Sequence, residues 1–302
     1  MCEGGKMAQL PGAMDYRTLA GTTVGLLSPP DVLDRIRSLI NDPNAGAGEL
    51  DEVIACDPGL TGQVLRMANN GRLEESSGID SVADAVKSIG IDELHGIIFA
   101  STANDVFSEI SEDLVSIEEF WHHSVCCGLA ADVLARCCGL ENPRRLFAAG
   151  LLHDIGQLPI YDALPEYAHR VLKTAGKAEQ YRYRAEKEII GFTHAQVGAE
   201  IMRHWQFPEK LREPVEFHHE PRRAERFPLE TAIVHIATNV ANVIEPSWKT
   251  SGDLEKSLRA IDPYVWQVTG LSEDEMEPVV NDVVMLSFDV TAIVTPGAMT
   301  IF

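Results

Sequence analysis

The run Gly150-Leu-Leu-His-Asp-Ile-Gly-Gln157 sets a histidine beside an aspartate at the end of an apolar helical segment. Adjacent side chains on a continuing helix diverge, so His153 and Asp154 reach one metal cluster only if the helix ends there. Gly156 and Pro159 supply that ending, since glycine readily closes a helix and proline interrupts its hydrogen bonds. The run therefore predicts a metal site at a helix end.

Further histidines stand on both sides of this run, each at or near a predicted helix end. His194 opens an apolar helix with Thr193 as its cap, and the pair His218-His219 closes another. Glu119 and His123 are four residues apart, on one face of a helix. The candidate metal ligands are Glu119, His123, His153, Asp154, His194, His218 and His219. Mixed nitrogen and oxygen ligands favour a divalent Fe, Mn, Ni or Zn ion over Mg or Ca.

A single histidine is more often a hydrogen-bonded core or surface residue than a ligand, so the order and surroundings of the set carry this prediction. The other histidines are interpreted as ordinary residues: His95, His169, His204 and His235.

Nearly every periodic segment of the chain has helical spacing, and no convincing strand alternation occurs, so the sequence predicts an all-α fold. Helices are expected at residues 31–40, 49–55, 81–89, 91–106, 117–138, 146–155, 192–205, 209–218 and 229–244, with weaker helical patterns in 253–302.

Composition excludes several classes of protein. The net charge of −21 argues against nucleic acid or an anionic membrane as the main partner, because both are bound through surplus Lys and Arg. The sequence has no apolar run of about 18 residues and no signal peptide pattern, so a cytoplasmic protein is expected. The adjacent pairs Cys126-Cys127 and Cys137-Cys138 are poorly placed to bond each other, and they fit reduced core thiols.

The run Leu151–Gly156 resembles the signature of the HD superfamily of metal-dependent phosphohydrolases, and the wider pattern is most similar to its HDOD branch, the HD-related output domain of bacterial signalling proteins. The segments that carry this resemblance are Asp57–Leu60, Val64–Asn69, Ser81-Val82, Ile89-Gly90, Trp121–Ser124, Ala148–Asp154, Thr193–Ala199 and Phe217–Pro221.

The resemblance covers roughly residues 28–244 and implies a multi-helix HD-like domain packed against an N-terminal helical lobe. The expected organisation is a flexible tail (1–14), the N-terminal lobe (15–110), the HD-like domain (111–246) and a C-terminal helical extension (247–302). Metal-facing roles are implied for the histidines and the aspartate of the candidate set. Glu119 stands where some HD enzymes with two or three metals carry an acidic ligand.

Two departures from the family pattern count against catalysis. Gln157 stands where active members usually carry lysine, and a neutral amide meets the charge of a phosphate only weakly. Thr238, with Asn239 beside it, stands where the family has a metal-binding aspartate, and losing a bridging carboxylate destabilises a two-metal arrangement. A single ion held by the remaining ligands is still expected, whereas efficient hydrolysis is not. No catalytic residue and no residue binding an organic cofactor is assigned.

Two functions remain open at this stage. The first is a stand-alone, non-catalytic signalling module that contacts other signalling proteins and keeps a metal or a small-molecule ligand in its pocket. The second is a metal-dependent phosphohydrolase acting on a nucleotide or a cyclic dinucleotide. Gln157 and Thr238 favour the first, as does the lack of the Gly-Tyr-Pro motif that accompanies cyclic dinucleotide hydrolysis in a related branch.

Overall fold

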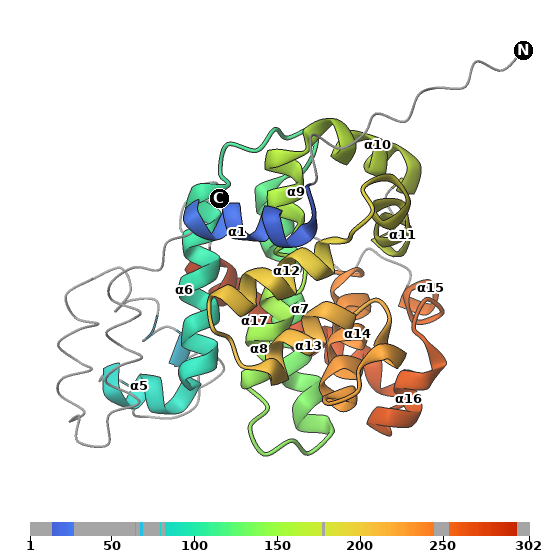
Figure 1. The fold of residues 1–302 in the computed structure, drawn as a ribbon. Coiled ribbons are helices and arrows are strands. Elements are labelled where there is room, and N and C mark those ends of the chain that lie inside the picture. The colour runs from blue at the N-terminus through green and yellow to red at the C-terminus, as the bar shows by residue number, and fades with distance from the viewer. Residues whose placement is uncertain are drawn as a thin grey trace, which may run out of the picture.

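The computed structural model describes residues 14–26, 82–176, 179–244 and 254–294, together with residues 64, 67, 68 and 79. These residues form helices and turns and no strand, which confirms the all-α prediction (Figure 1). The α-helices are α1 (Tyr16–Leu26), α5 (Val82–Ile89), α6 (Ile91–Val106), α7 (Ile117–Cys137), α8 (Arg145–Leu152), α9 (Gln157–Ala163), α10 (Pro165–Ala175), α11 (Glu179–Ile189), α12 (His194–His204), α13 (Glu209–Phe217), α14 (Pro228–Ala241), α15 (Leu254–Leu258), α16 (Pro263–Thr269) and α17 (Met276–Val294). Two short 3₁₀ helices are η1 (Pro221–Arg223) and η2 (Glu273–Glu275).

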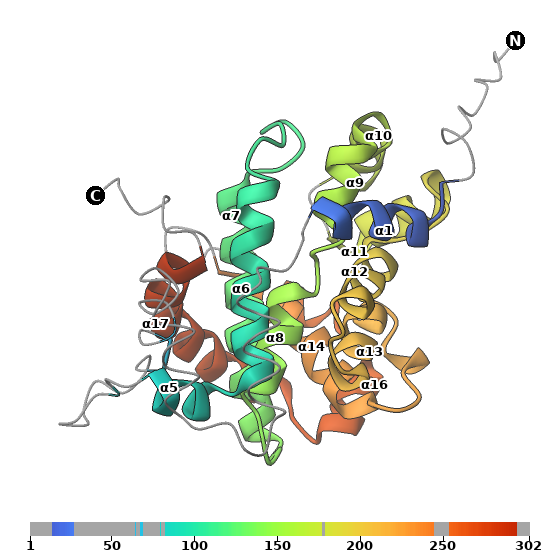
Figure 2. The ribbon, with the colours of Figure 1, turned by 60° about the vertical axis from the view of Figure 1, so that its left-hand side comes forward.

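Helix α7 is the centre of the fold, and α8, α14 and α17 pack directly against it (Figure 2). Its middle, from Ser124 to Ala131, is buried on every side, which explains why this stretch is apolar or small throughout instead of amphipathic. The N-terminal helices pack on helices of the predicted HD-like segment: α1 lies on α12, and α6 lies on α8. The predicted packing of an N-terminal lobe against an HD-like helical domain is thereby confirmed.

Helices α7 and α8 approach closely because both carry glycine where they cross. A Cβ atom on Gly150 would lie 2.6 Å from the Cys127 carbonyl oxygen and 2.8 Å from the Gly128 Cα atom. This close crossing brings the end of α8, where His153 lies, next to His123 on α7, with their ring centroids 5.2 Å apart. Small residues in the core thus determine where the histidines meet.

The predicted helices from residue 81 to 244 are all present, with ends that shift by a few residues. The largest shifts are at the ends of α14, which stops at Ala241, and of α8, which stops at Leu152, so that residues 153–156 form the turn that leads into α9. Helices α9, α10 and α11 were not predicted, and the helices expected at 31–40 and 49–55 lie outside the described residues. Of the helices described, none is both long enough and apolar enough to cross a membrane.

Three C-terminal helices pack on the preceding ones: α15 and α16 contact α14, and α17 runs along α7. The loop before α16 also reaches the histidine region, because the backbone N–H of Asp262 donates to His235 Nε2 at 3.1 Å. The extension therefore supports the inner helices instead of standing apart from them.

A buried acid between α6 and the HD-like helices makes stability depend on pH. Glu93 is 2% exposed, and burial raises its pKa to about 8, with nearby Asp132 adding to the rise. Its folded pKa lies above its ordinary value of 4.5, so the folded state holds the proton in the window between the two values. Stability therefore falls as pH rises from about 4.5 to 8, by about 1.4 kcal/mol per pH unit. Urea unfolding of Glu93→Gln should lack this slope, whereas the exposed control Glu109→Gln should keep it.

Candidate metal centre

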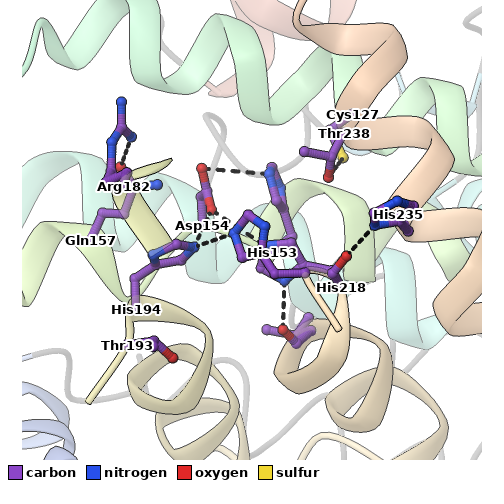
Figure 3. A network of polar contacts seen from close by, with 12 residues as sticks. Cys127, His153, Asp154, Gln157, Arg182, Thr193, His194, His218, His235 and Thr238 are labelled. Carbon is purple, nitrogen blue, oxygen red and sulfur yellow. Dashed lines mark hydrogen bonds and ion pairs between the residues drawn. The ribbon is translucent and has the colours of Figure 1, made fainter. Parts of the chain in front are cut away.

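Six of the seven predicted ligands converge in the interior, although they come from four different parts of the fold (Figure 3). His123 projects from the second turn of α7, and His153 and Asp154 lie at the end of α8. His194 is the first residue of α12, while His218 and His219 follow the last turn of α13. Three helix termini and one position inside a helix, His123 on α7, therefore build the cluster.

Asp154 lies at the centre of the cluster, and imidazole nitrogens surround its carboxylate. Its Oδ1 atom lies 3.0 Å from His194 Nε2 and 3.7 Å from His218 Nε2. Its Oδ2 atom lies 3.5 Å from His153 Nε2. Burial alone would raise the pKa of Asp154, but His153 and His194 hold it well below its usual range. The carboxylate is therefore ionised at neutral pH, which is the form that binds a metal.

Backbone carbonyl groups orient two of the imidazoles. His153 Nδ1 donates to the Gly150 carbonyl oxygen, and His218 Nδ1 donates to the Val215 carbonyl oxygen, both at 2.7 Å. With Nδ1 engaged in this way, each ring turns its Nε2 atom toward Asp154. A hydrogen bond from one ring nitrogen that fixes the other as ligand is the usual arrangement around protein-bound metals.

His194 is oriented by a buried carboxylate that the sequence did not indicate. Glu186, from α11, accepts from His194 Nδ1 at 2.7 Å and from the His194 backbone N–H at 2.8 Å. Burial lowers the pKa of His194, but the Glu186 and Asp154 carboxylates outweigh it and raise the value to about 10. In the metal-free protein an imidazolium at His194 thus balances two buried negative charges.

Three further histidines of the cluster, His123, His218 and His219, are neutral at physiological pH. Burial lowers the pKa of His123, and it holds the pKa of His218 and of His219 well below the ordinary range. A neutral imidazole keeps the lone pair that a metal requires. These residues are therefore in the protonation state of ligands.

The donor atoms fit a transition metal. They form two groups, Asp154 with His194, His218 and His219, and Asp154 with His123 and His153, and within each group the atoms lie within 4.8 Å of one another. Two donors about 2.1 Å from one ion lie at most about 4.2 Å apart, so a small inward movement completes either group. The Nε2 atoms of His123 and His218 are buried without a hydrogen-bonding partner among the described residues, and a metal would satisfy both.

The structure does not bring Glu119 to the cluster. It lies in the first turn of α7, one turn before His123, and its side chain is exposed. The spacing of four residues does place Glu119 and His123 on one face of the helix. Only His123 lies at the part of the helix where the cluster is buried.

The two residues that depart from the family pattern are both buried near the cluster. Gln157 is 1% exposed and opens α9, directly after the His153-Asp154 turn. Thr238, on α14, is 4% exposed, and its hydroxyl lies 3.6 Å from the Cys127 sulfur. Thr238 therefore contacts a core thiol, and a hydroxyl adds no negative charge to the centre.

His235, which the sequence analysis treated as ordinary, supports the backbone of the centre. Its Nδ1 donates to the His218 carbonyl oxygen at 2.6 Å, and its Nε2 accepts from Asp262 as described above. A histidine three residues before the Thr238 position is a weak sequence signal. Glu186 gave no signal at all, because it stands in a helix whose composition is that of a solvated surface.

A surface cleft lies beside the cluster, and none of the six converging residues lines it. Its volume is about 240 Å³, and it is lined by Tyr183, Lys187, Thr193, Gln196, Glu216, Phe217 and Arg223. The Tyr183 ring packs on His219, with ring centroids 4.7 Å apart, while the Tyr183 hydroxyl donates to Glu220. Thr193 and Gln196 form the capping box that begins α12, which confirms Thr193 as the predicted cap. Tyr183 therefore contacts both the cleft and the cluster.

Replacing Glu186 with glutamine should weaken metal binding about 10- to 100-fold, because a carboxylate that accepts from the free ring nitrogen of a metal-binding histidine contributes that much. The carboxylate of Glu186 orients His194 and increases the basicity of its ring. The amide of glutamine carries no negative charge and would lose both effects. A competition titration of Zn²⁺ against a chromophoric chelator measures the change. Glu188→Gln, an exposed substitution on the same helix, is the matched control and should bind as wild type does.

Comparison with known proteins places this fold and motif set in a family. The sequence model of the HDOD domain matches residues 26–221. A curated protein of Treponema pallidum, of uncharacterised function, is 23% identical over 191 residues, which are 63% of this chain and 37% of that protein. The chain thus spans just over a third of the length of that relative.

Solved structures share the fold at low identity. An HDOD domain protein of unknown function from Geobacter sulfurreducens is 23% identical with a TM-score of 0.60, over 89% of this chain and 97% of that one. A protein from Shewanella amazonensis described as a candidate phosphohydrolase is 22% identical with a TM-score of 0.66, over 90% and 97%. A candidate signal transduction protein from Marinobacter aquaeolei is 18% identical with a TM-score of 0.66, over 96% and 62%.

Proposed function

The chain belongs to the HDOD domain family, and on this premise we propose that it is a signalling module that holds a transition metal without hydrolysing phosphoesters. The burial of the metal-binding atoms is the observation that carries the proposal. His153 and His194 are 0% exposed, His218 is 1% exposed and Asp154 is 3% exposed. Hydrolysis needs a metal with an open position that both water and substrate can reach.

The residues that would hold the ion are His123, His153, Asp154, His194, His218 and His219, and the ion would be Fe, Mn, Ni or Zn because the donors are imidazoles with one carboxylate. A bound ion supplies a local positive charge and a fixed link between the segments that ligate it. Here it would join α7, the end of α8, α12 and the end of α13, so that metal loading stabilises the folded state of the whole helical domain.

Contact with other signalling proteins is the output we propose for such a module. The strong negative charge of the chain supports protein partners over nucleic acid. A metal that fixes how the central helices pack also fixes the surface that those helices present.

One observation favours the second candidate, a phosphohydrolase acting on a nucleotide or a cyclic dinucleotide. Asp154 is common to both groups of donor atoms, so two ions would share its carboxylate, as in two-metal hydrolytic sites. Against this candidate stand the buried donors and the uncharged side chains at Gln157 and Thr238.

Turnover by metal-loaded protein separates the two functions. We expect bis(p-nitrophenyl) phosphate, nucleotides and a cyclic dinucleotide to be hydrolysed no faster than by a variant with His153→Ala and Asp154→Ala together. A rate that is clear in wild type and absent from the variant would establish the hydrolase instead.

A further inference from the structure

One residue of the C-terminal extension, Asp262, is tied to both ends of the segment 218–222, which carries two of the candidate metal ligands. At one end, the Asp262 backbone N–H donates to His235 Nε2, and His235 Nδ1 donates to the His218 carbonyl oxygen at 2.6 Å (Figure 3). At the other end, Nε and Nη2 of Arg222 donate to the two carboxylate oxygens of Asp262, both at 2.8 Å. The extension therefore holds this segment at two points.

The His235 imidazole is the inner of the two connections, and it acts on the backbone of the ligands. Because the Asp262 backbone N–H can only donate, Nε2 accepts, and the ring proton is on Nδ1, where it donates to the His218 carbonyl oxygen. That carbonyl belongs to the planar peptide unit that joins His218 to His219. Holding it fixes the backbone from which both imidazoles project, and His235 is itself buried.

The outer connection is built into the start of α16. Asp262 is the N-cap of this helix, and its Oδ1 atom accepts from the Tyr264 backbone N–H at 2.9 Å. The Arg222 guanidinium lies over the Tyr264 ring, 5.0 Å from the ring centroid. The carboxylate that caps α16 is thus the one that binds Arg222, so the start of α16 and the end of the ligand segment are held together.

Residues 254–269, called the docked segment below, contain the two short helices α15 and α16. These helices have 5 and 7 residues, and isolated helices shorter than about 12–15 residues are marginal in water. Both pack on α14, and the Ser257 hydroxyl donates to the Asn239 carbonyl oxygen at 2.6 Å. The order of the docked segment therefore depends on its contacts with the inner helices and with the ligand segment.

We propose that docking of this segment and metal occupancy of the centre are linked equilibria, with His235 as the positioning residue that joins them. With the imidazoles of His218 and His219 held by an ion, the carbonyl group to which His235 donates is held as well. A segment that docks through this carbonyl then docks more tightly. By thermodynamic reciprocity, a docked segment increases metal affinity by the same factor. The inference rests on the proposed function and deepens it, because it names the part of the surface that responds to the metal.

Hydrogen–deuterium exchange followed by mass spectrometry, in metal-free protein and at saturating Zn²⁺, measures this link. In wild type we expect Zn²⁺ to slow exchange in the docked segment about 5- to 150-fold, the usual range of coupling between two sites. His235→Phe keeps a ring and removes both hydrogen bonds. In this variant the slowing should be lost from the docked segment and kept in α12, which carries His194.

A competition titration of Zn²⁺ against a chromophoric chelator tests the reverse direction. His235→Phe should weaken Zn²⁺ binding by the same factor of about 5 to 150, because the coupling is reciprocal. Asp262→Asn keeps the backbone N–H and an oxygen for the cap but loses the charge that binds Arg222, so it should weaken binding about 5-fold, at the low end of that range. The matched control is Arg259→Gln, which breaks an exposed ion pair with Glu255 on the same extension and should match wild type in both measurements.

A purely structural role for His235 gives a different result. Exchange in the docked segment would then be faster in His235→Phe by one factor with and without Zn²⁺, and the slowing by Zn²⁺ would persist, which would overturn the inference. If His235→Phe does not fold, Asp262→Asn decides the question, and wild-type Zn²⁺ affinity with wild-type slowing in that variant would overturn the inference too.

The two measurements also separate this inference from the proposed function. A wild type that binds Zn²⁺ in the competition titration but shows equal exchange in the docked segment with and without the ion overturns the link and leaves the proposed function standing. A wild type that binds no Zn²⁺ refutes the proposed function, and the link is refuted with it.

Discussion

A variant with His153→Ala and Asp154→Ala together is expected to lose the whole stabilisation that a metal chelator removes from wild type. Asp154 belongs to both groups of donor atoms, and His153 belongs to one, so neither group keeps its full set. An ion present at 100 times its dissociation constant stabilises a folded protein by about 2.7 kcal/mol. For a chain of 302 residues that corresponds to a fall of about 4 °C in the Tm of wild type when EDTA is added, and to no change for the variant.

The matched control is a second histidine and aspartate pair at the surface. His169 Nε2 lies 3.2 Å from Asp113 Oδ2, and both side chains are exposed. His169→Ala with Asp113→Ala should keep the full chelator effect, because this pair is exposed and belongs to neither group of donor atoms. If EDTA leaves the Tm of wild type unchanged, the cluster holds no ion that matters for folding.

Gly156→Ala is the single substitution expected to damage the centre most without touching a ligand. A Cβ atom at this position would lie 2.1 Å from the His194 carbonyl oxygen and 2.6 Å from the Gly198 backbone nitrogen. Both are backbone atoms of α12, so the turn and the helix must move apart. Overpacking of this kind costs about 1–3 kcal/mol and sometimes more. The movement also carries His194 away from Asp154, so metal affinity should fall together with stability.

Urea unfolding and the Zn²⁺ competition titration measure the two effects. Gly21→Ala is the control, since a Cβ atom there meets nothing within 4 Å and alanine favours a helix over glycine by about 1 kcal/mol. A Gly156→Ala protein that is as stable as wild type and binds metal equally well would show that α9 and α12 do not position His194.

The sequence predicts the all-α fold and selects six residues that the structure brings together, because both follow from local patterns. Helical periodicity identifies α7, α8, α12 and α13, and the chain shows His153, His194 and His218 at or near helix ends. Thr193 is recognisable as a cap because Gln196 stands three residues later, at the spacing of a capping box.

The residues that orient the ligands could not be predicted, because only the tertiary fold brings them in. Glu186, which orients His194, lies on α11, a charge-rich helix whose composition is that of a surface element. Glu119 was predicted as a ligand and does not reach the cluster. Its spacing from His123 is right for one helix face, but its side chain is exposed. The sequence analysis treated Gln157 only as the loss of a charge. In the structure its amide oxygen accepts a hydrogen bond from Arg182, a contact that no sequence pattern indicated.

Metal content of the purified protein, measured by mass spectrometry beside the His153→Ala, Asp154→Ala variant, tests the central claim most directly. The arrangement of Asp154 with His194, His218 and His219 predicts near-stoichiometric Fe, Mn, Ni or Zn in wild type and none in the variant. Equal and negligible metal in both proteins would contradict it, and would reduce the buried cluster to a set of charge-balanced core residues.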